Sequence, residues 1–207
     1  MKKKTKEIII EAAIDLFNEL GVQNVTSRSL AKKIGISHGN LDYHFNTKEA
    51  LLIAIYEQMR EEMTASYEFK EDQFSSFEHF HRLMMHIDKF QSKYRFFNLD
   101  VLEISRSNPE VAKILKGTLV NRKEQMQQFF NRFLEEGLIV MNEDISFERL
   151  QHTIRIIITF WLPQQELLIG YKTDQTGIMP KYIWELLIPV MTIQGKKEYH
   201  RILESLG

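Results

Sequence analysis

The sequence predicts an all-α protein in which a small N-terminal domain of three helices precedes a larger helical bundle. Apolar residues recur at the helical period over long stretches, and no alternating segment is long enough to form a strand. The 207 residues also include only 4 prolines and 9 glycines, too few to punctuate many strands and turns. The composition, 43% hydrophobic and 27% charged, is that of a folded globular chain.

The first two helices are predicted from their apolar stripes and their end signals. The first stripe has helical spacing and consists of Ile9, Ala13, Leu16, Phe17 and Leu20. Gly21 is expected to end this helix. A second, short helix is expected after a cap at Thr26 or Ser27, and Gly35 ends it. The outward side of this helix is basic.

The third and fourth helices follow at once. Ser37 is expected to cap the third, which reaches about Phe45. Asn46 or Thr47 then caps a fourth helix, which runs to about Ser66. The first four helices are therefore short or medium in length and closely spaced.

The remainder of the chain is predicted to form longer helices rich in aromatic residues and methionine. Pro163 and Pro189 lie inside two of these segments and predict kinks or breaks there. The expected helices cover residues 74–92, 93–106, 109–136, 146–170, 177–194 and 197–205.

Charge is distributed unevenly along the chain, although the net charge is only −1. Residues 1–48 hold eight Lys or Arg against five Asp or Glu, whereas the remainder holds 19 against 23. A basic end on an acidic body is expected when that end meets phosphate.

Several classes of site are not expected. The chain has no cysteine, which excludes disulfides and thiolate ligands. His79, His81 and His86 lack the i, i+4 spacing of helical metal ligands, so we expect no metal and no cofactor. No nucleophile elbow, phosphate loop or dinucleotide fingerprint is present, so no catalytic residue is assigned and no enzyme is predicted. Neither a signal peptide nor a membrane span is apparent, and we expect a cytoplasmic protein.

Residues 26–45, TSRSLAKKIGISHGNLDYHF, have the arrangement of a helix-turn-helix. In that motif the second helix enters the major groove of DNA. At 100° per residue, Leu41 and Phe45 share the buried side of this helix, and Gly39 and Tyr43 lie opposite. A glycine lets the backbone approach the duplex, and Tyr43 offers a hydroxyl for phosphate.

The candidate DNA-contacting residues lie at the start of the second helix, along the third and at the start of the fourth. The side chains that begin the second and fourth helices are expected to clamp neighbouring phosphates. The full set is Thr26, Ser27, Arg28, Ser37, His38, Gly39, Asn40, Asp42, Tyr43, His44 and Lys48.

The segment from about residue 8 to residue 56 resembles the tetracycline-repressor (TetR/AcrR) family of bacterial transcriptional regulators. The matching pieces are Ala12-Ala13, Leu16-Phe17, Gly21, Thr26, Leu30-Ala31, Gly35-Ile36-Ser37, Gly39-Asn40-Leu41, Tyr43-His44-Phe45 and Lys48-Glu49-Ala50-Leu51-Leu52. The resemblance implies a homodimer, a C-terminal domain for ligand binding and dimerisation, and repression relieved by a small molecule.

Asp42 departs from that family's pattern, which often has an aromatic residue at this position. A carboxylate facing phosphate is unfavourable, but it can accept a hydrogen bond from a cytosine amino group. Alternatively, Asp42 pairs with a nearby cation such as Lys33, or favours the helix N-terminus. The base preference of the helix is left open by these alternatives.

We assign residues 1–48 to the DNA-binding domain and residues 49–207 to a ligand-binding and dimerisation domain. Most bulky apolar residues of the second domain are expected to form its core, and some to line a pocket for an apolar or amphipathic effector. The candidate pocket residues are Met84, Phe90, Phe97, Phe130, Phe160 and Trp161.

Two segments, near residues 154–161 and 183–188, are apolar on nearly every side. Such helices must be buried all round, and pairing of two subunits through a four-helix interface is one way to bury them. A central intramolecular helix is the alternative. The candidate interface residues are Ile154, Ile158, Trp184 and Leu187.

The sequence therefore predicts a dimeric transcription repressor that binds a palindromic double-stranded operator and is released by a small effector. Its two heads are expected about 34–36 Å apart, so that they reach successive major grooves. An activator, a regulator without a small-molecule signal and a helical protein–protein adaptor remain alternatives.

Overall fold

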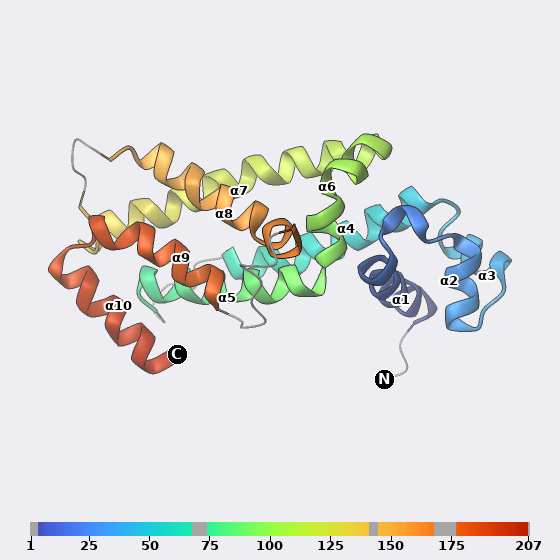
Figure 1. Cartoon of the computed structure of the whole chain (residues 1–207), viewed down its shortest axis with the longest axis horizontal. Helices are drawn as coiled ribbons and strands as arrows, with labels where there is room; N and C mark the ends of the chain where they lie inside the picture. The colour runs from blue at the N-terminus through green and yellow to red at the C-terminus, as the bar shows by residue number, and fades with distance from the viewer. Residues whose placement is uncertain (1–3, 68–73, 141–144, 168–176, 207) are drawn as a thin grey trace. The chain divides into compact units, whose positions relative to one another are not determined.

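The computed structural model describes residues 4–67, 74–140, 145–167 and 177–206, and these are helical almost throughout (Figure 1). The all-α fold class is confirmed. The only pairing of extended residues in the described ranges is a single bridge between Ile139 and Met191. The helices are α1 (Thr5–Leu20), η1 (Val22–Asn24), α2 (Ser27–Ile34), α3 (His38–His44), α4 (Lys48–Tyr67), α5 (Ser76–Lys93), α6 (Arg95–Ser107), α7 (Pro109–Glu135), α8 (Phe147–Leu167), α9 (Ile178–Leu187), η3 (Ile188–Val190) and α10 (Ile193–Leu206).

The expected helix over residues 177–194 is divided by a break at Pro189, where the sequence predicted a kink or break. The α-helix ends at Leu187, a short 3₁₀ turn follows, and Met191 is extended before α10 begins at Ile193. Pro189 explains the break, because it has no N–H to donate and its ring crowds the preceding turn. Pro163, in contrast, is accommodated inside α8.

The chain divides into two compact units. The first comprises residues 1–64 and 94–118, and the second comprises residues 65–93 and 119–207. The domain boundary expected at residue 48 falls inside the first unit, at the start of α4. That unit therefore holds the helix-turn-helix segment together with α6.

Within the first unit, α6 is attached to α1 by polar and aromatic contacts. The backbone N–H of Phe96 donates to Oδ1 of Asn18 at 2.9 Å. The backbone N–H of Val22 donates to Oδ2 of Asp100 at 3.3 Å. The rings of Phe17 and Phe96 lie 5.3 Å apart. These contacts fix the base of the N-terminal helices on α6.

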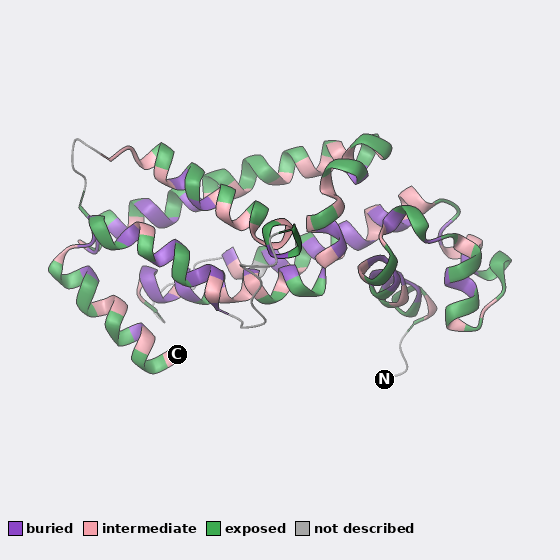
Figure 2. Ribbon diagram, in the orientation of Figure 1, coloured by how far each residue is buried: buried purple, intermediate pink, exposed green. Residues whose placement is uncertain are grey.

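The core of the second unit is an aromatic cluster from α5, α7 and α9. Phe77 and Phe80 of α5 pack edge-on against both Phe133 of α7 and Trp184 of α9, with ring centroids 4.8–5.5 Å apart. All four side chains have at most 1% of their surface exposed, and Figure 2 shows buried residues along these helices. Edge-to-face packing of this kind adds about 0.5–1.5 kcal/mol per pair to the burial of apolar surface.

His81 and Trp184 form a buried polar contact in this core. The indole Nε1–H of Trp184 donates to Nδ1 of His81 at 3.2 Å, so the imidazole nitrogen must be unprotonated. Burial, followed by the charge of Arg82, lowers the pKa of His81 from its usual value of 6.5. The charge of Glu78 opposes this shift but does not reverse it.

The stability of the protein is therefore expected to fall as the pH drops below 6.5, where the unfolded histidine takes up a proton and the folded one resists it. Titration of His81 lowers the free energy of unfolding by at most about 1.4 kcal/mol per pH unit. This decrease stops once the pH falls below the pKa of His81 in the folded protein. Urea unfolding between pH 7.5 and 5.5 measures it. His81→Asn keeps an oxygen acceptor for Trp184, so the free energy of unfolding of this variant should fall less steeply with pH than that of the wild type. An equally steep fall would assign the effect to another group.

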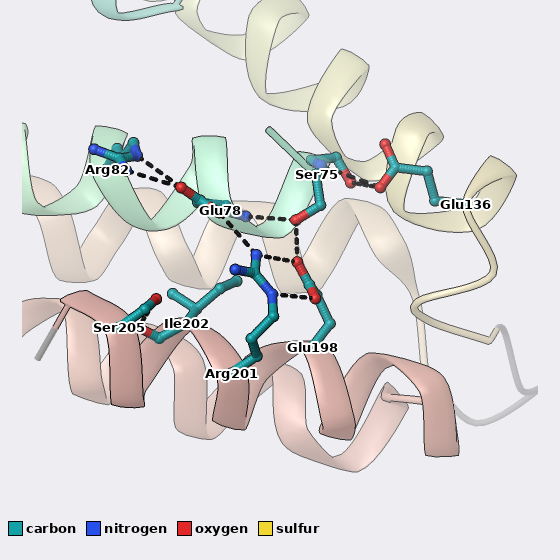
Figure 3. A network of polar contacts seen from close by, with 9 residues as sticks. Ser75, Glu78, Arg82, Glu136, Glu198, Arg201, Ile202 and Ser205 are labelled. Atoms are coloured by element: carbon teal, nitrogen blue, oxygen red, sulfur yellow. Dashed lines mark hydrogen bonds and ion pairs between the residues drawn. The ribbon is translucent and has the colours of Figure 1, made fainter. Parts of the chain in front are cut away.

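Helix α10 is held beside α5 by a network of charged side chains (Figure 3). Glu78 accepts hydrogen bonds from Arg82 at 2.8 Å and from Arg201 at 2.7 Å. Burial alone would raise the pKa of Glu78, but the hydrogen bonds and the charges of the two arginines together outweigh it and hold the pKa below its usual range. Arg201 also binds Glu198, which in turn accepts a hydrogen bond from Ser75.

The start of α10 also lies directly on the turn that follows α7. The backbone N–H of Thr192 donates to the carbonyl oxygen of Leu138 at 3.0 Å, and the Thr192 hydroxyl donates to the carbonyl oxygen of Gly137 at 2.7 Å. Gly195 lies so close to this turn that a Cβ atom there would be 1.9 Å from the Leu138 oxygen. Glycine is therefore required at this position.

Within the ranges that the structure describes, every helix is too short or too polar to span a lipid bilayer.

Candidate nucleic-acid interface

Helices α2 and α3 form the expected helix-turn-helix, and the expected capping residues begin both. The hydroxyl of Thr26 accepts from the backbone N–H of Ser29 at 3.1 Å. The hydroxyl of Ser37 accepts from the backbone N–H of Asn40 at 3.1 Å. Gly35 ends α2 with φ of +71°, in the left-handed region that glycine adopts without strain. The turn between the helices is thus encoded locally.

The two faces of α3 lie as the helical period predicts. Leu41 and Phe45 are 2% and 5% exposed, and they anchor the helix on the bundle beneath it. Tyr43, on the opposite side, is 85% exposed. Gly39 and Asn40 are exposed as well. A polar helix face is therefore open to solvent.

The residues expected to contact DNA are all at least partly accessible. Those that the structure leaves exposed are Thr26, Arg28, Ser37, His38, Gly39, Asn40 and Tyr43, and those that are half-buried are Ser27, Asp42, His44 and Lys48. They come from the start of α2, from α3 and its cap, and from the start of α4. Three of them, Lys48, His38 and Asp42, have partners within the protein that were not predicted from the sequence.

Lys48 is turned toward the protein. Its Nζ donates to the carbonyl oxygen of Val22 at 2.9 Å, and burial lowers its pKa. In this position Lys48 satisfies the backbone of η1. To reach a phosphate it would have to give up that hydrogen bond.

Asp42 pairs with a residue of its own helix. Nδ1 of His38 lies 2.9 Å from Oδ2 of Asp42, one helical turn away. Lys33 was an alternative partner predicted from the sequence, but its Nζ lies 3.9 Å from Oε2 of Glu19. The interpretation that Lys33 pairs with Asp42 is wrong. The i, i+4 spacing was the signal that favoured His38.

The candidate pocket residues do not form one group. Met84 and Phe130 are fully buried in the second unit, whereas Phe160 is 50% exposed there. Phe90 and Trp161 are half-buried in the same unit, and Phe97 belongs to the first unit.

Three of the four candidate interface residues are covered by their own chain. Ile154 and Leu187 are 0% exposed and Trp184 is 1% exposed, while Ile158 is half-buried. These three side chains are therefore buried within their own chain, which was the alternative to burial between two subunits. The exposed apolar residues of α8, α9 and η3 are instead their neighbours Ile156, Phe160, Leu167, Tyr182 and Ile188.

Sequence reasoning missed two buried polar atoms on α5. Oε1 of Gln91 and Nε2 of His86 have no hydrogen-bond partner among the described residues. The amide nitrogen of Gln91 donates to the carbonyl oxygen of Ile158 in α8 at 2.6 Å, and His86 lies beside Phe90. A glutamine seven residues after Met84, and so on the same apolar helix face, was the signal in the sequence.

Comparison with known proteins identifies both parts of the chain. Residues 9–55 match the family model described as bacterial regulatory proteins, tetR family. Residues 58–199 match a second model, described as bacterial transcriptional repressor.

Curated relatives match part of the chain. The tetracycline repressor protein class A from transposon 1721 of Escherichia coli is 41% identical over 78 residues, which are 37% of this chain and 36% of the repressor. The match thus spans about a third of that relative's length. The regulator UidR of Escherichia coli K12 is 25% identical over 135 residues, which are 65% of this chain and 69% of UidR.

Solved structures share the fold over nearly the whole chain. A TetR-family transcriptional regulator from Marinobacter aquaeolei VT8 has a TM-score of 0.86 at 20% identity, covering 98% of both chains. A transcriptional regulator from Saccharomonospora viridis, solved in complex with choline, has a TM-score of 0.72 at 15% identity, covering 90% of this chain and 97% of that one.

Proposed function

Since this chain belongs to the TetR family of bacterial transcriptional regulators, we propose that it acts as a dimeric repressor whose α3 helices bind a palindromic operator. A small effector then releases the protein from the operator. The family is one of regulators and not of enzymes, which confirms the expectation of a non-enzymatic protein. The observation that carries the proposal is the open polar face of α3, held outward by Leu41 and Phe45.

Residues 1–48 carry the DNA contacts in this proposal. Tyr43 and Asn40 are exposed on α3 and reach the groove, and Arg28 at the start of α2 meets the phosphate backbone. Lys48 joins them by exchanging its hydrogen bond to Val22 for one to phosphate. Phosphate contacts of this kind make affinity fall steeply with added salt.

Fluorescence anisotropy with duplexes enriched from a random-sequence library tests DNA binding. We expect tight binding at about 50 mM salt and release by about 200 mM. Absence of binding at low salt would favour the protein–protein adaptor instead.

Tyr43→Ala is expected to weaken DNA binding about tenfold, the value of one hydrogen bond to a charged group. Because the side chain is 85% exposed, thermal stability should not change. Tyr43→Phe keeps the ring and removes the hydroxyl, so it separates a phosphate contact from an apolar one. If Tyr43→Ala bound DNA with wild-type affinity, Tyr43 would not be a DNA contact.

The dimer is proposed to form through α8 and α9. Ile156, Phe160 and Leu167 lie on one face of α8 and are 46%, 50% and 80% exposed. Tyr182 of α9 is 48% exposed and contacts Trp161 of α8, with ring centroids 5.3 Å apart. A contiguous apolar face of this kind is typical of a subunit interface. The two operator-binding heads are then expected about 34–36 Å apart.

The effector is proposed to bind in the second unit, beside α5. Buried polar atoms are normally hydrogen-bonded, so Gln91 Oε1 favours a ligand with a hydrogen-bond donor, and His86 Nε2 favours a second polar group on it. Met84 and Phe90, from the candidate pocket, lie on the same helix and supply apolar surface. An amphipathic molecule suits this combination. Screening small molecules for release of the protein from DNA, with Gln91→Leu as the control variant, tests the site.

A further inference from the structure

We propose that His38 and Asp42 form one base-reading unit on α3. In this unit Asp42 holds the imidazole so that its outer nitrogen accepts a hydrogen bond from the amino group of adenine or cytosine. The inference rests on the proposed insertion of α3 into the major groove, and it names a specificity determinant of that contact.

The geometry places the pair at the edge of the groove-facing side. His38 is the first residue of α3, and the N-terminal residues of a recognition helix are those that reach base edges. Its Nδ1 lies 2.9 Å from Oδ2 of Asp42, and the two side chains are 48% and 41% exposed. The pair is therefore formed before DNA arrives and remains accessible to it.

The contact with Asp42 decides which imidazole nitrogen is free. A carboxylate only accepts hydrogen bonds, so Nδ1 of His38 must carry the proton in this pair. In the neutral ring, Nε2 then has a lone pair and no hydrogen. It can accept but not donate.

An acceptor at this position discriminates between bases. In the major groove adenine and cytosine present amino groups, whereas thymine presents a carbonyl oxygen and guanine presents only acceptors. His38 in this tautomer therefore favours adenine or cytosine over guanine or thymine. Oδ2 of Asp42 is engaged by Nδ1, and Asp42 acts as the positioning residue. In this proposal the base contact is made by His38.

A purely structural pair predicts something different. An exposed i, i+4 pair stabilises a helix by only a few tenths of a kcal/mol. Losing it would weaken binding to all DNA sequences alike and would leave the preferred bases unchanged. Base preference, and not affinity alone, is therefore the informative measurement.

The experiment selects bound duplexes from a random-sequence library with the wild-type chain and three variants. We expect the wild-type motif to contain one position in each half-site where adenine or cytosine is favoured about tenfold. His38→Ala and Asp42→Ala should lose the preference at that position and keep the rest of the motif. Asp42→Glu retains a carboxylate, which can only accept from Nδ1–H, so it should keep the preference.

Three outcomes would overturn the inference. If His38→Ala selects the wild-type motif, His38 does not read a base. If Asp42→Ala keeps the preference, Asp42 does not act by fixing the tautomer. If the wild-type chain enriches no motif, DNA recognition by α3 fails and the inference fails with it. Circular dichroism of each variant confirms that α3 and its bundle are still folded.

Discussion

Gly195→Ala is expected to lower the free energy of unfolding by about 3 kcal/mol, near the upper end of what overpacking costs. The added methyl carbon would lie 1.9 Å from the carbonyl oxygen and 2.9 Å from the carbonyl carbon of Leu138. Both are backbone atoms, so no rotamer change relieves the clash. The start of α10 must move away from the turn after α7, and the hydrogen bonds of Thr192 to that turn are lost.

Gly117→Ala is the matched control, because it makes the same chemical change inside α7. Apart from the adjoining backbone of its own helix, an added methyl group there meets no atom within 4 Å. Since alanine favours helix over glycine, this variant should be more stable than the wild type by about 0.5–1 kcal/mol. Urea unfolding of both variants gives the comparison.

Tryptophan fluorescence can show which part of the protein is destabilised in Gly195→Ala. Tyr199 of α10 lies against Trp184 of α9, with ring centroids 5.0 Å apart. Displacement of α10 should therefore change the emission of Trp184 before global unfolding. Equal stability of Gly195→Ala and the wild type would mean that the backbone approach at Leu138 is not tight.

The parts of the fold that the sequence predicts well are those whose causes are local. The faces of α3 follow from the spacing of Leu41 and Phe45, and its cap follows from Ser37. The break after α9 follows from Pro189. In each case the residues that decide the outcome are within one or two helical turns of each other.

The parts that the sequence does not predict depend on residues far apart in the chain. Lys48 turns inward because the carbonyl oxygen of Val22 lies within its reach, and no local pattern records that. The attachment of α1 to α6 joins Asn18 to Phe96 across 78 positions. Composition alone also could not separate core from surface on α8, because Ile154 and Phe160 are both bulky and apolar, yet only Ile154 is buried.

That difference between Ile154 and Phe160 provides the sharpest test of the proposed dimer. Phe160→Glu is expected to convert the protein to a monomer, because it would place a charge in an apolar interface without a partner. Its side chain is 50% exposed in the single chain, so the fold itself should survive. Sedimentation velocity measures the change in mass.

Loss of the dimer should also weaken operator binding by about a hundredfold or more, because two linked heads bind with a high effective concentration. Leu102→Glu is the matched control: it adds the same charge at an apolar position of α6 that is 65% exposed and lies in the first unit. This variant should remain dimeric and keep its affinity for DNA. If Phe160→Glu stays dimeric while Leu102→Glu dissociates, the subunits pair through α6, and α8 and α9 do not form the interface.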